Sequence, residues 1–387
     1  MRKMAFILGF TAFIFAGCSK DSSPTPQPPG PPAPPDPVTQ KDISSIDDAV
    51  ESFRNTYNIP GVSIAIMKNE KLVYIKSYGT QSSTDNTPVT NTSLYRIASV
   101  SKPITAIGIM KLLEAGKLTL DSKVFGTGGI LENDFNTTKL ASISDITIRH
   151  LLHHTTGAWP NDGTDPMFKQ QTYDFNQLIK WTLDTYPATG NRGVYKYSNF
   201  GYCLLGRVIE KLSGKTYEKF IKDEVLAPCG ITGMEIGGST LAERKSGEVL
   251  YTGQSGQNPY IYNVARMDAH GGWIASAKDL AKLMIKVDGF NNKPDILKAS
   301  TITTMTTRSV PSSNYACGWG VNNANNWWHA GGIPGTAAQI VRSSGGFNWV
   351  ILCNSRNANA AFGGALDGLL WPIVNNTATP WQNIDQF

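Results

Sequence analysis

The sequence predicts an α+β fold of the α/β-sandwich type, in which helices flank an antiparallel sheet and an inserted segment forms a helical lobe. Strand-like segments lie near both ends of the chain, at residues 61–67 and 71–78 and again at 316–321, 336–341 and 347–353. Helical patterns occupy most of the sequence between them. Because strands at both ends enclose helices, we expect one sheet built from the two chain ends, with the middle of the chain forming the second lobe.

The helices and turns of this sheet domain follow from apolar spacing. The first helix is predicted at residues 43–57, and residues 68–70 separate the first two strands as the turn of a hairpin would. A buried helix is expected where apolar residues continue from Ile104 to Leu118. A last helical stretch is predicted at 361–374, after the C-terminal strands.

The first residues have the composition of a secretory signal, which we assign to residues 1–17. Arg2 and Lys3 precede an apolar run at residues 4–15 that is too short to span a bilayer. Small residues then precede Cys18, an arrangement that resembles a bacterial lipobox. It predicts a lipid on Cys18 that anchors the protein to a membrane of the bacterial cell envelope, facing the periplasm or the surface. An ordinary signal peptide with an incidental cysteine is the alternative.

Residues 18–40 are predicted to carry the lipidated cysteine and a linker, because Ser, Thr and above all Pro dominate residues 22–37. Such a sequence cannot form a core and adopts an extended, semi-rigid spacer. Residues 41–387 are long enough to bury a sizeable core and contain no second low-complexity break. We therefore expect one folded domain over 41–387.

Charge gives no sign of a nucleic-acid partner. The formal net charge is +5, and removal of Arg2 and Lys3 with the signal leaves 33 basic and 30 acidic residues. The sequence has no block of basic residues and no basic stripe interleaved with aromatic residues. Binding to a phosphate backbone is therefore not expected.

No metal ion or other cofactor is expected either. His153 and His154 are adjacent, so their side chains do not face one ligand site on a helix. Beyond Cys18 the chain has four cysteines, none in a Cys-x-x-Cys pair: Cys203, Cys229, Cys317 and Cys353. The first and last of these lie in apolar runs, which favours free, buried thiols.

The chain's one Ser-x-x-Lys, Ser99 to Lys102, lies where a strand-like stretch at 94–98 gives way to a helical pattern. A serine hydroxyl is a poor nucleophile until a base is held against it and dipoles face the oxyanion that forms. Residues three apart share a helix face, so the Lys102 amine can reach the Ser99 hydroxyl. A helix-capping serine is the alternative interpretation.

The chain's one Tyr-x-Asn, Tyr197 to Asn199, precedes a helical run at 202–212. A phenol beside a lysine can be held partly ionised and carry protons, and the asparagine amide offers both a donor and an acceptor. An aromatic packing residue followed by a capping asparagine is the alternative.

The third motif is His329-Ala330-Gly331-Gly332, which precedes the strand predicted at 336–341. Its small residues would let a substrate backbone lie against the strand, and an N–H near Gly332 could complete an oxyanion hole with that of Ser99. A glycine-rich hairpin with a surface histidine is the alternative.

Two further groups receive structural interpretations. Asp162, Asp165 and Asp174 lie in a loop rich in Gly, Pro, Asn and Thr, which predicts solvated turn residues. Trp327 and Trp328 alternate across a strand, so one is expected to face the cleft while the other packs below it.

Together, in this order, the three motifs resemble the serine β-lactamase and penicillin-binding-protein superfamily, and specifically its class C β-lactamase-like branch. The resemblance covers the chain from about residue 43 onward. It implies a β-lactamase/transpeptidase-like fold and a serine hydrolase in which Ser99 is acylated while Lys102 and Tyr197 share the proton transfers. It also implies that Asn199 holds the acyl side chain and that His329, Gly331 and Gly332 line the substrate cleft.

The chain departs from the branch at two positions, because its β-lactamases usually have Lys where this chain has His329 and a hydroxyl residue where it has Ala330. A histidine with a pKa near ~6.5 is mostly neutral at pH 7 and cannot replace a fixed cation that binds a substrate carboxylate. We therefore expect a lipid-anchored hydrolase of small esters, amides or peptides. The alternatives are a β-lactamase or D-alanyl-D-alanine carboxypeptidase, and a non-catalytic binding protein of the cell envelope.

Overall fold

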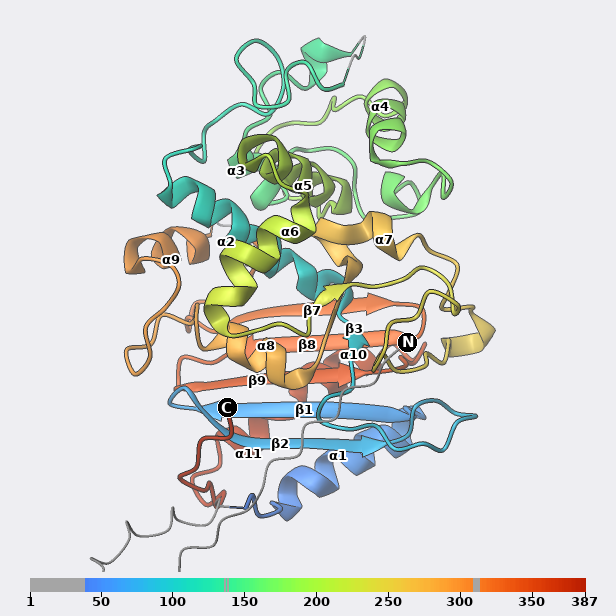
Figure 1. Cartoon of the computed structure of the whole chain (residues 1–387), viewed down its shortest axis with the longest axis vertical. Helices are drawn as coiled ribbons and strands as arrows, with labels where there is room; N and C mark the ends of the chain where they lie inside the picture. Colours follow the sequence, from blue (N-terminus) through green and yellow to red (C-terminus); the bar gives the residue numbers. More distant parts are fainter. Residues whose placement is uncertain (1–38, 136, 138, 309–313) are drawn as a thin grey trace, which may run out of the picture. The chain divides into compact units, whose positions relative to one another are not determined.

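Six strands form one antiparallel sheet in the order β2-β1-β9-β8-β7-β6 (Figure 1). β1 pairs with β2 on one side and with β9 on the other, so Ile64 near the start of the chain lies opposite Ile351 near its end. The sheet predicted from the two chain ends is confirmed. Its strands are β1 (Gly61–Lys68), β2 (Lys71–Gly79), β6 (Gly320–Val321), β7 (Trp327–Ile333), β8 (Thr336–Arg342) and β9 (Phe347–Cys353).

A second sheet has three strands in the order β3-β5-β4. It consists of β3 (Tyr95–Arg96), β4 (Glu235–Ile236) and β5 (Trp273–Ala275). The helices are α1 (Ser44–Tyr57), α2 (Ser101–Glu114), α3 (Ile148–Leu152), α4 (Phe175–Thr185), α5 (Asn199–Ser213), α6 (Tyr217–Ile221), α7 (Val264–Met267), α8 (Ala277–Met284), α9 (Ala299–Thr306), α10 (Phe362–Gly368) and α11 (Trp371–Val374).

This computed structural model describes residues 39–135, 137, 139–308 and 314–387. The predicted signal peptide, Cys18 and nearly all of the linker lie outside the described residues. Residues 40–387 form one unit, to which the following description applies. Within the part of the chain that is described, no helix is both long enough and apolar enough to cross a membrane.

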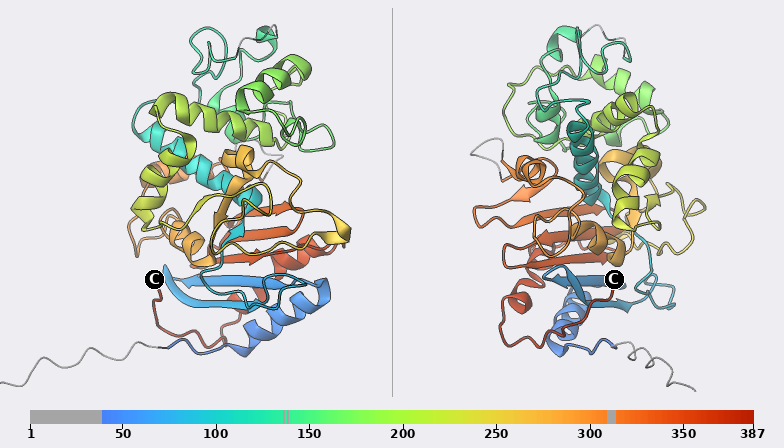
Figure 2. Two further views of the ribbon diagram at one scale, coloured as in Figure 1. Left: turned by 45° about the vertical axis from the view of Figure 1, so that its right-hand side comes forward. Right: turned by 60° about the vertical axis from the view of Figure 1, so that its left-hand side comes forward.

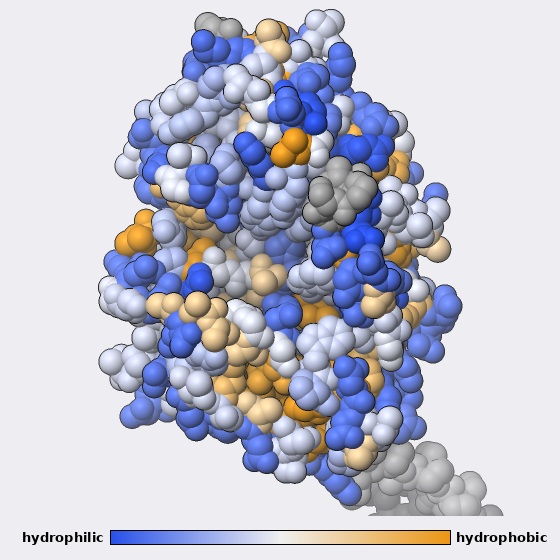
Figure 3. Space-filling view, turned by 180° about the vertical axis from the view of Figure 1, so that it is seen from behind, coloured by the Kyte–Doolittle hydropathy of each residue, from blue (hydrophilic) through white to orange (hydrophobic). Residues whose placement is uncertain are grey.

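The large sheet is covered on both faces. Helices α1, α10 and α11 pack on its outer face, where Ile46 and Val50 of α1 join Trp349 and Ile351 in one apolar cluster. α8 packs against β9 and β1 on the inner face, and the helical lobe lies beyond it (Figure 2). Because both faces are buried, β9 is a continuous apolar run rather than an alternating one. In Figure 3, apolar residues gather in the lower half of the side on which α10 lies.

α2 is the central helix of the molecule, since 11 of its 14 residues are buried. Pro103 is tolerated because N–H groups in the first turn have no intrahelical partner. Gly108 permits close packing, since a Cβ there would lie 2.7 Å from the Ile221 Cδ1. α2 thereby packs closely against the helices α5 and α6.

Three predicted elements are shorter than expected. The strand predicted at 316–321 is only β6, because the chain turns at Gly318, which has a φ of +81°. The strand-like stretch before Ser99 ends after β3, because Ala98 adopts a left-handed conformation with a φ of +45°. The helix predicted at 361–374 is divided into α10 and α11. The four cysteines in the described residues are free and buried, as favoured for Cys203 and Cys353.

Candidate active site

Ser99 lies in a short 3-10 turn (Ala98–Val100) between β3 and α2. β3, which precedes this turn, pairs with β5. The Ile97 N–H also donates to the Trp273 carbonyl oxygen over 3.0 Å. Because Ser99 is in the first turn of the helical segment, its N–H has no intrahelical partner. It is therefore available to a developing negative charge.

β7 approaches the Ser99 turn closely because Gly331 has no side chain. A Cβ at Gly331 would lie 2.2 Å from the Ile97 carbonyl oxygen and 3.2 Å from the Ser99 nitrogen. The short β6 pairs only with Trp327 and Trp328, so the rest of the β7 edge is not paired by β6. An extended substrate can add to such an edge through main-chain hydrogen bonds.

Lys102 is fully buried, and its Nζ lies 3.1 Å from the Ser99 Oγ. Nζ also donates to the Asn199 Oδ1 over 2.7 Å and to the His270 carbonyl oxygen over 2.8 Å. Burial holds the pKa of Lys102 well below its usual range, although the Asp165 carboxylate raises it in part. The three acceptors around Nζ match the three N–H groups of an ammonium. When the amine is neutral, the two carbonyl-type acceptors can hold its two N–H groups, which leaves its lone pair for the Ser99 hydroxyl.

Tyr197 closes the other side of the nucleophile. Its ring centre lies 4.8 Å from the Lys102 Nζ. Burial raises the pKa of Tyr197, although Ser99 nearby lowers it in part. The expectation of a partly ionised phenol is therefore wrong, because burial disfavours the charged phenolate. His154 packs on the Tyr197 ring with centroids 4.2 Å apart.

Asn199 connects Lys102 to a buried carboxylate. Its Nδ2 donates to the Asp165 Oδ2 over 2.8 Å and to the Asn161 Oδ1 over 3.1 Å, while its Oδ1 accepts from Lys102. These contacts let Asn199 position the lysine. Because Asn199 also lines a pocket next to Ser99, its contact with the acyl side chain of a substrate stays a prediction. Asn161 lines the same pocket.

Asp165 is 1% exposed, so its interpretation as a solvated turn residue is wrong. Its Oδ1 accepts from the Met167 N–H, and burial raises its pKa to about 6. Asp162 and Asp174 do have turn and helix-capping roles: Asp162 accepts from the Thr164 N–H and Asp174 caps α4. Loop composition could not distinguish the three aspartates, because only packing against Asn199 buries one of them.

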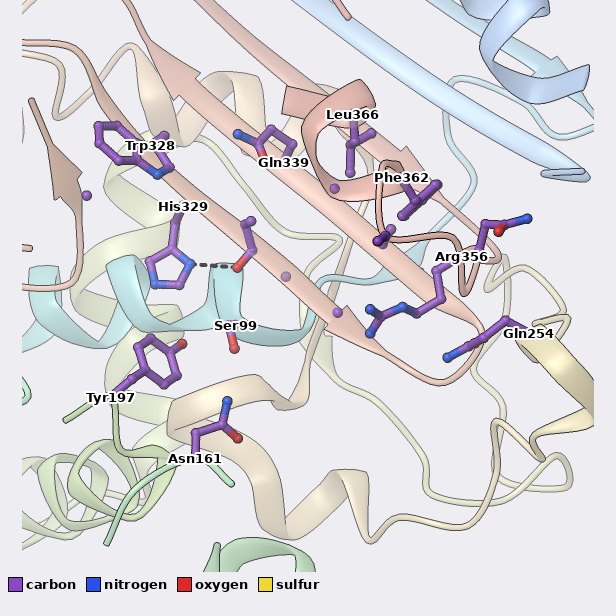
Figure 4. Close-up of a pocket in the computed structure, with 18 of the residues that line it drawn as sticks. Ser99, Asn161, Tyr197, Gln254, Trp328, His329, Gln339, Arg356, Phe362 and Leu366 are labelled. Atoms are coloured by element: carbon purple, nitrogen blue, oxygen red, sulfur yellow. Dashed lines mark hydrogen bonds between the residues drawn. The ribbon is translucent and has the colours of Figure 1, made fainter. Parts of the chain in front are cut away.

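His329 is buried on β7 and is not a surface histidine. Its Nδ1 lies 2.8 Å from the Ala330 carbonyl oxygen (Figure 4). Its Nε2 lies 2.9 Å from the Tyr315 hydroxyl. Burial lowers the pKa of His329 to about 3, so the ring is neutral at pH 7. Trp328 faces the pocket while Trp327 packs in the core, as alternation across the strand predicted.

The nucleophile lies where two hollows meet. The main pocket has a volume of about 930 Å³ and runs along β7 between the aromatic side chains around His329 and the loop at 356–363. The side pocket, of about 400 Å³, extends from Ser99 toward α7 and the β7–β8 turn. Six residues line both: Ser99, Asn161, Gln254, Gln257, Gly332 and Arg356. Sequence reasoning singled out Ser99 and Gly332 only, since loop positions carry no periodic signal of burial.

Within the described residues, no cluster of three or more His, Cys, Asp or Glu side chains could hold a metal ion. The His153 Nε2 instead lies 3.3 Å from the Cys317 Sγ, and the His154 Nδ1 accepts from the Ser198 N–H. Both histidines shape the loops around the site.

A sheet flanked by helices, with a lysine-paired serine at the N-terminal end of a buried helix, is the arrangement of the β-lactamase and penicillin-binding-protein superfamily. The Beta-lactamase family model matches residues 46–368, and the chain belongs to this family.

Curated relatives include protein flp of Staphylococcus aureus (strain COL), which is 26% identical over 316 residues, covering 79% of this chain and 61% of that protein. Penicillin-binding protein 4* of Bacillus subtilis (strain 168) is 26% identical over 302 residues, covering 70% of this chain and 62% of that protein. The chain thus spans less than two thirds of the length of these relatives.

Solved structures share the fold. The octameric penicillin-binding protein homologue from Pyrococcus abyssi superposes with a TM-score of 0.68 at 24% identity, covering 81% of this chain and 74% of that one. The D-amino acid amidase from Ochrobactrum anthropi SV3, complexed with L-phenylalanine amide, has a TM-score of 0.69 at 21% identity. The match covers 86% of this chain and 97% of that one.

Proposed function

We propose that this protein hydrolyses small esters or amides through an acyl-enzyme on Ser99, as a member of the class C β-lactamase-like branch. The observation that carries the proposal is the arrangement of Lys102. Its two N–H groups are held by carbonyl-type oxygens, and its pKa is lowered by burial. A neutral amine whose lone pair faces a serine hydroxyl at 3.1 Å is a general base in place.

Acylation then proceeds through proton transfers among Ser99, Lys102 and Tyr197. Lys102 takes the Ser99 proton as Oγ bonds to the substrate carbonyl carbon, and the oxyanion is stabilised by the N–H groups of Ser99 and Gly332. Tyr197, whose raised pKa keeps it protonated, donates its proton to the departing oxygen or nitrogen and is reprotonated by the Lys102 ammonium. The carbonyl–leaving-group bond breaks, and water later hydrolyses the Ser99 ester by the same route.

The neutral His329 supports esters over β-lactams. A β-lactam carries a carboxylate on the leaving-group side, and no fixed cation is offered by His329 there. D-Amino acid amides are the second candidate substrates, because a D-amino acid amidase has the same fold over 86% of this chain.

Two covalent probes, read by intact mass, test the proposal. We expect a fluorophosphonate to label the wild-type protein once, and Ser99→Ala to lose the label while its free energy of unfolding stays within about 1 kcal/mol. Fluorescent penicillin is expected to label more slowly than the fluorophosphonate. An unlabelled wild type would support the non-catalytic binding protein, and faster penicillin labelling would support the β-lactamase or carboxypeptidase.

We further propose that the mature protein is anchored to the bacterial cell envelope through a lipid on Cys18. The supporting features are the short apolar run and the small residues before the cysteine. Cys18→Ser should move the protein from the membrane fraction to the soluble fraction or leave an unprocessed precursor. A mature wild-type N-terminus without lipid would contradict the proposal.

A further inference from the structure

The walls of the two pockets carry almost no charge. In the described part of the chain, neither pocket is lined by any Asp, Glu or Lys. The two histidines on the walls are neutral, because burial lowers the pKa of His329 to about 3 and holds that of His270 well below its usual range. Arg356 is the one Arg or Lys side chain that lines either pocket in the described chain, and its guanidinium is a fixed cation.

Arg356 has no acidic partner within the described residues, because none of the ion pairs formed there includes it. Its side chain is half-buried, and its guanidinium stands over Gly332, where a Cβ would lie 3.0 Å from Nη1. A cation partly removed from water without a counter-charge is stabilised when an anionic ligand supplies one.

The backbone that carries Arg356 is fixed in place. The preceding Ser355 Oγ donates to the Thr252 carbonyl over 2.6 Å, and Asn354 accepts from the Gly61 N–H over 2.7 Å. The guanidinium is therefore presented from a braced turn at the end of β9, and less ordering is required on binding.

Gln254 lies beside Arg356 near the β7–β8 turn (Figure 4). Its Oε1 accepts from the Gly335 N–H over 3.1 Å, and its Nε2 donates to the Gln257 Oε1 over 2.9 Å. An amide nitrogen carries two N–H groups, so one remains for a ligand. Guanidinium and amide together can hold both oxygens of a carboxylate.

Arg356 stands on the acyl side of the scissile bond. Tyr197 donates the proton to the leaving group, and Tyr197 lies with His329 on one side of Ser99, whereas Arg356 and Gln254 lie on the other (Figure 4). The acyl part of a substrate bound at Ser99 therefore extends toward Arg356.

We propose that Arg356, assisted by Gln254, binds a carboxylate carried by the acyl part of the substrate. The substrate class is then an ester or amide of a dicarboxylic acid, or of a peptide whose acyl residue has an acidic side chain. This inference rests on the proposed function, since it takes Ser99 as the acylated residue.

The catalytic test compares the p-nitrophenyl half-ester of glutaric acid with the neutral p-nitrophenyl valerate. Wild-type kcat/KM should favour the half-ester, and Arg356→Gln should reduce the half-ester to valerate ratio about 10- to 100-fold, as loss of a charge-assisted pair implies. Arg356→Lys should recover part of the ratio. Lys117→Gln, the same charge change at an exposed residue that lines neither pocket, should leave it unchanged.

A ratio that is unchanged in Arg356→Gln would overturn the proposal. Binding is measured separately, by titrating monomethyl glutarate into Ser99→Ala and into the Ser99→Ala/Arg356→Gln double variant in a calorimeter. Loss of binding only in the double variant supports the anion site even if neither ester is hydrolysed, which would refute the proposed function alone. Equal binding to both variants would refute the anion site.

Discussion

Removing the charge of Asp165 should move the pH dependence of acylation to lower pH. The Asp165 carboxylate raises the pKa of Lys102 across the Asn199 bridge, and Lys102 must be neutral to accept the Ser99 proton. Loss of the charge therefore lowers the pKa of Lys102 and extends activity into acid. The effect is fully present only above the Asp165 pKa of about 6.

The magnitude follows from the bridge itself. The Nζ to Oδ1 contact is 2.7 Å and the Nδ2 to Oδ2 contact is 2.8 Å. Adding the width of the amide places the two charges about 7 Å apart, and at an effective dielectric constant of about 20 they interact by roughly 2 kcal/mol. That energy corresponds to a movement of the acid limb by about 1 to 2 pH units.

The assay is the rate of fluorophosphonate labelling between about pH 4 and pH 9, a range that extends to both sides of the Asp165 pKa of about 6. Asp165→Asn and Asp165→Ala share the loss of charge but differ in hydrogen bonding, so a downward movement common to both is electrostatic. Asp162→Asn, an exposed aspartate of the same loop, is the matched control and should behave as wild type. An acid limb that stays in place, or moves upward, in both Asp165 variants would refute the reasoning.

Three further predictions concern the groups around Ser99. Lys102→Ala and Tyr197→Phe should each slow fluorophosphonate labelling at least about a hundredfold, and the double variant should be little worse than the more impaired single variant, because both act on one proton path; independent, multiplying losses would contradict this. His329→Lys should raise the nitrocefin to short-chain ester ratio of kcat/KM roughly 5- to 30-fold, equivalent to about 1–2 kcal/mol for a new charge-assisted contact; an unchanged ratio would place the residue away from the substrate carboxylate. His329→Gln should become more stable relative to wild type as pH falls from 6.5 toward 4.5, because the pKa of His329 is lowered to about 3 and only the unfolded wild type takes up the proton there. Urea unfolding at the two pH values should show the difference in unfolding free energy changing by about 2–3 kcal/mol, and a constant difference would contradict the neutral ring.

The strands and the central helix could be predicted because the local spacing of apolar residues along the sequence indicates which positions are buried. β8 and β9 coincide with the apolar runs at 336–341 and 347–353 to within one residue, and the helix behind Ser99 follows its apolar positions. The three motifs could be found because each carries a rare combination of residue types at a fixed spacing.

The loop residues of the site could not be predicted, because their environment is created by distant segments. In the sequence, Asp165 resembles any aspartate of a turn, because its burial depends on contact with Asn199, 34 positions later. Arg356 follows an apolar strand and resembles a surface residue in sequence. Only the fold brings it against Gly332, which belongs to a different strand. The state of Tyr197 also depended on packing, since burial outweighed the lysine that was expected to ionise it.

The pairing of β1 with β9 has a consequence for how the protein is made. β9 pairs directly with β1, yet about 280 residues of chain separate the two strands. The sheet therefore cannot form completely until late in synthesis. Ser99 and His329 are likewise brought together only after the helical lobe has been synthesised. Closure of the sheet therefore depends on contacts of high sequence separation, and the site around Ser99 cannot be completed before β7 and β9 have been synthesised.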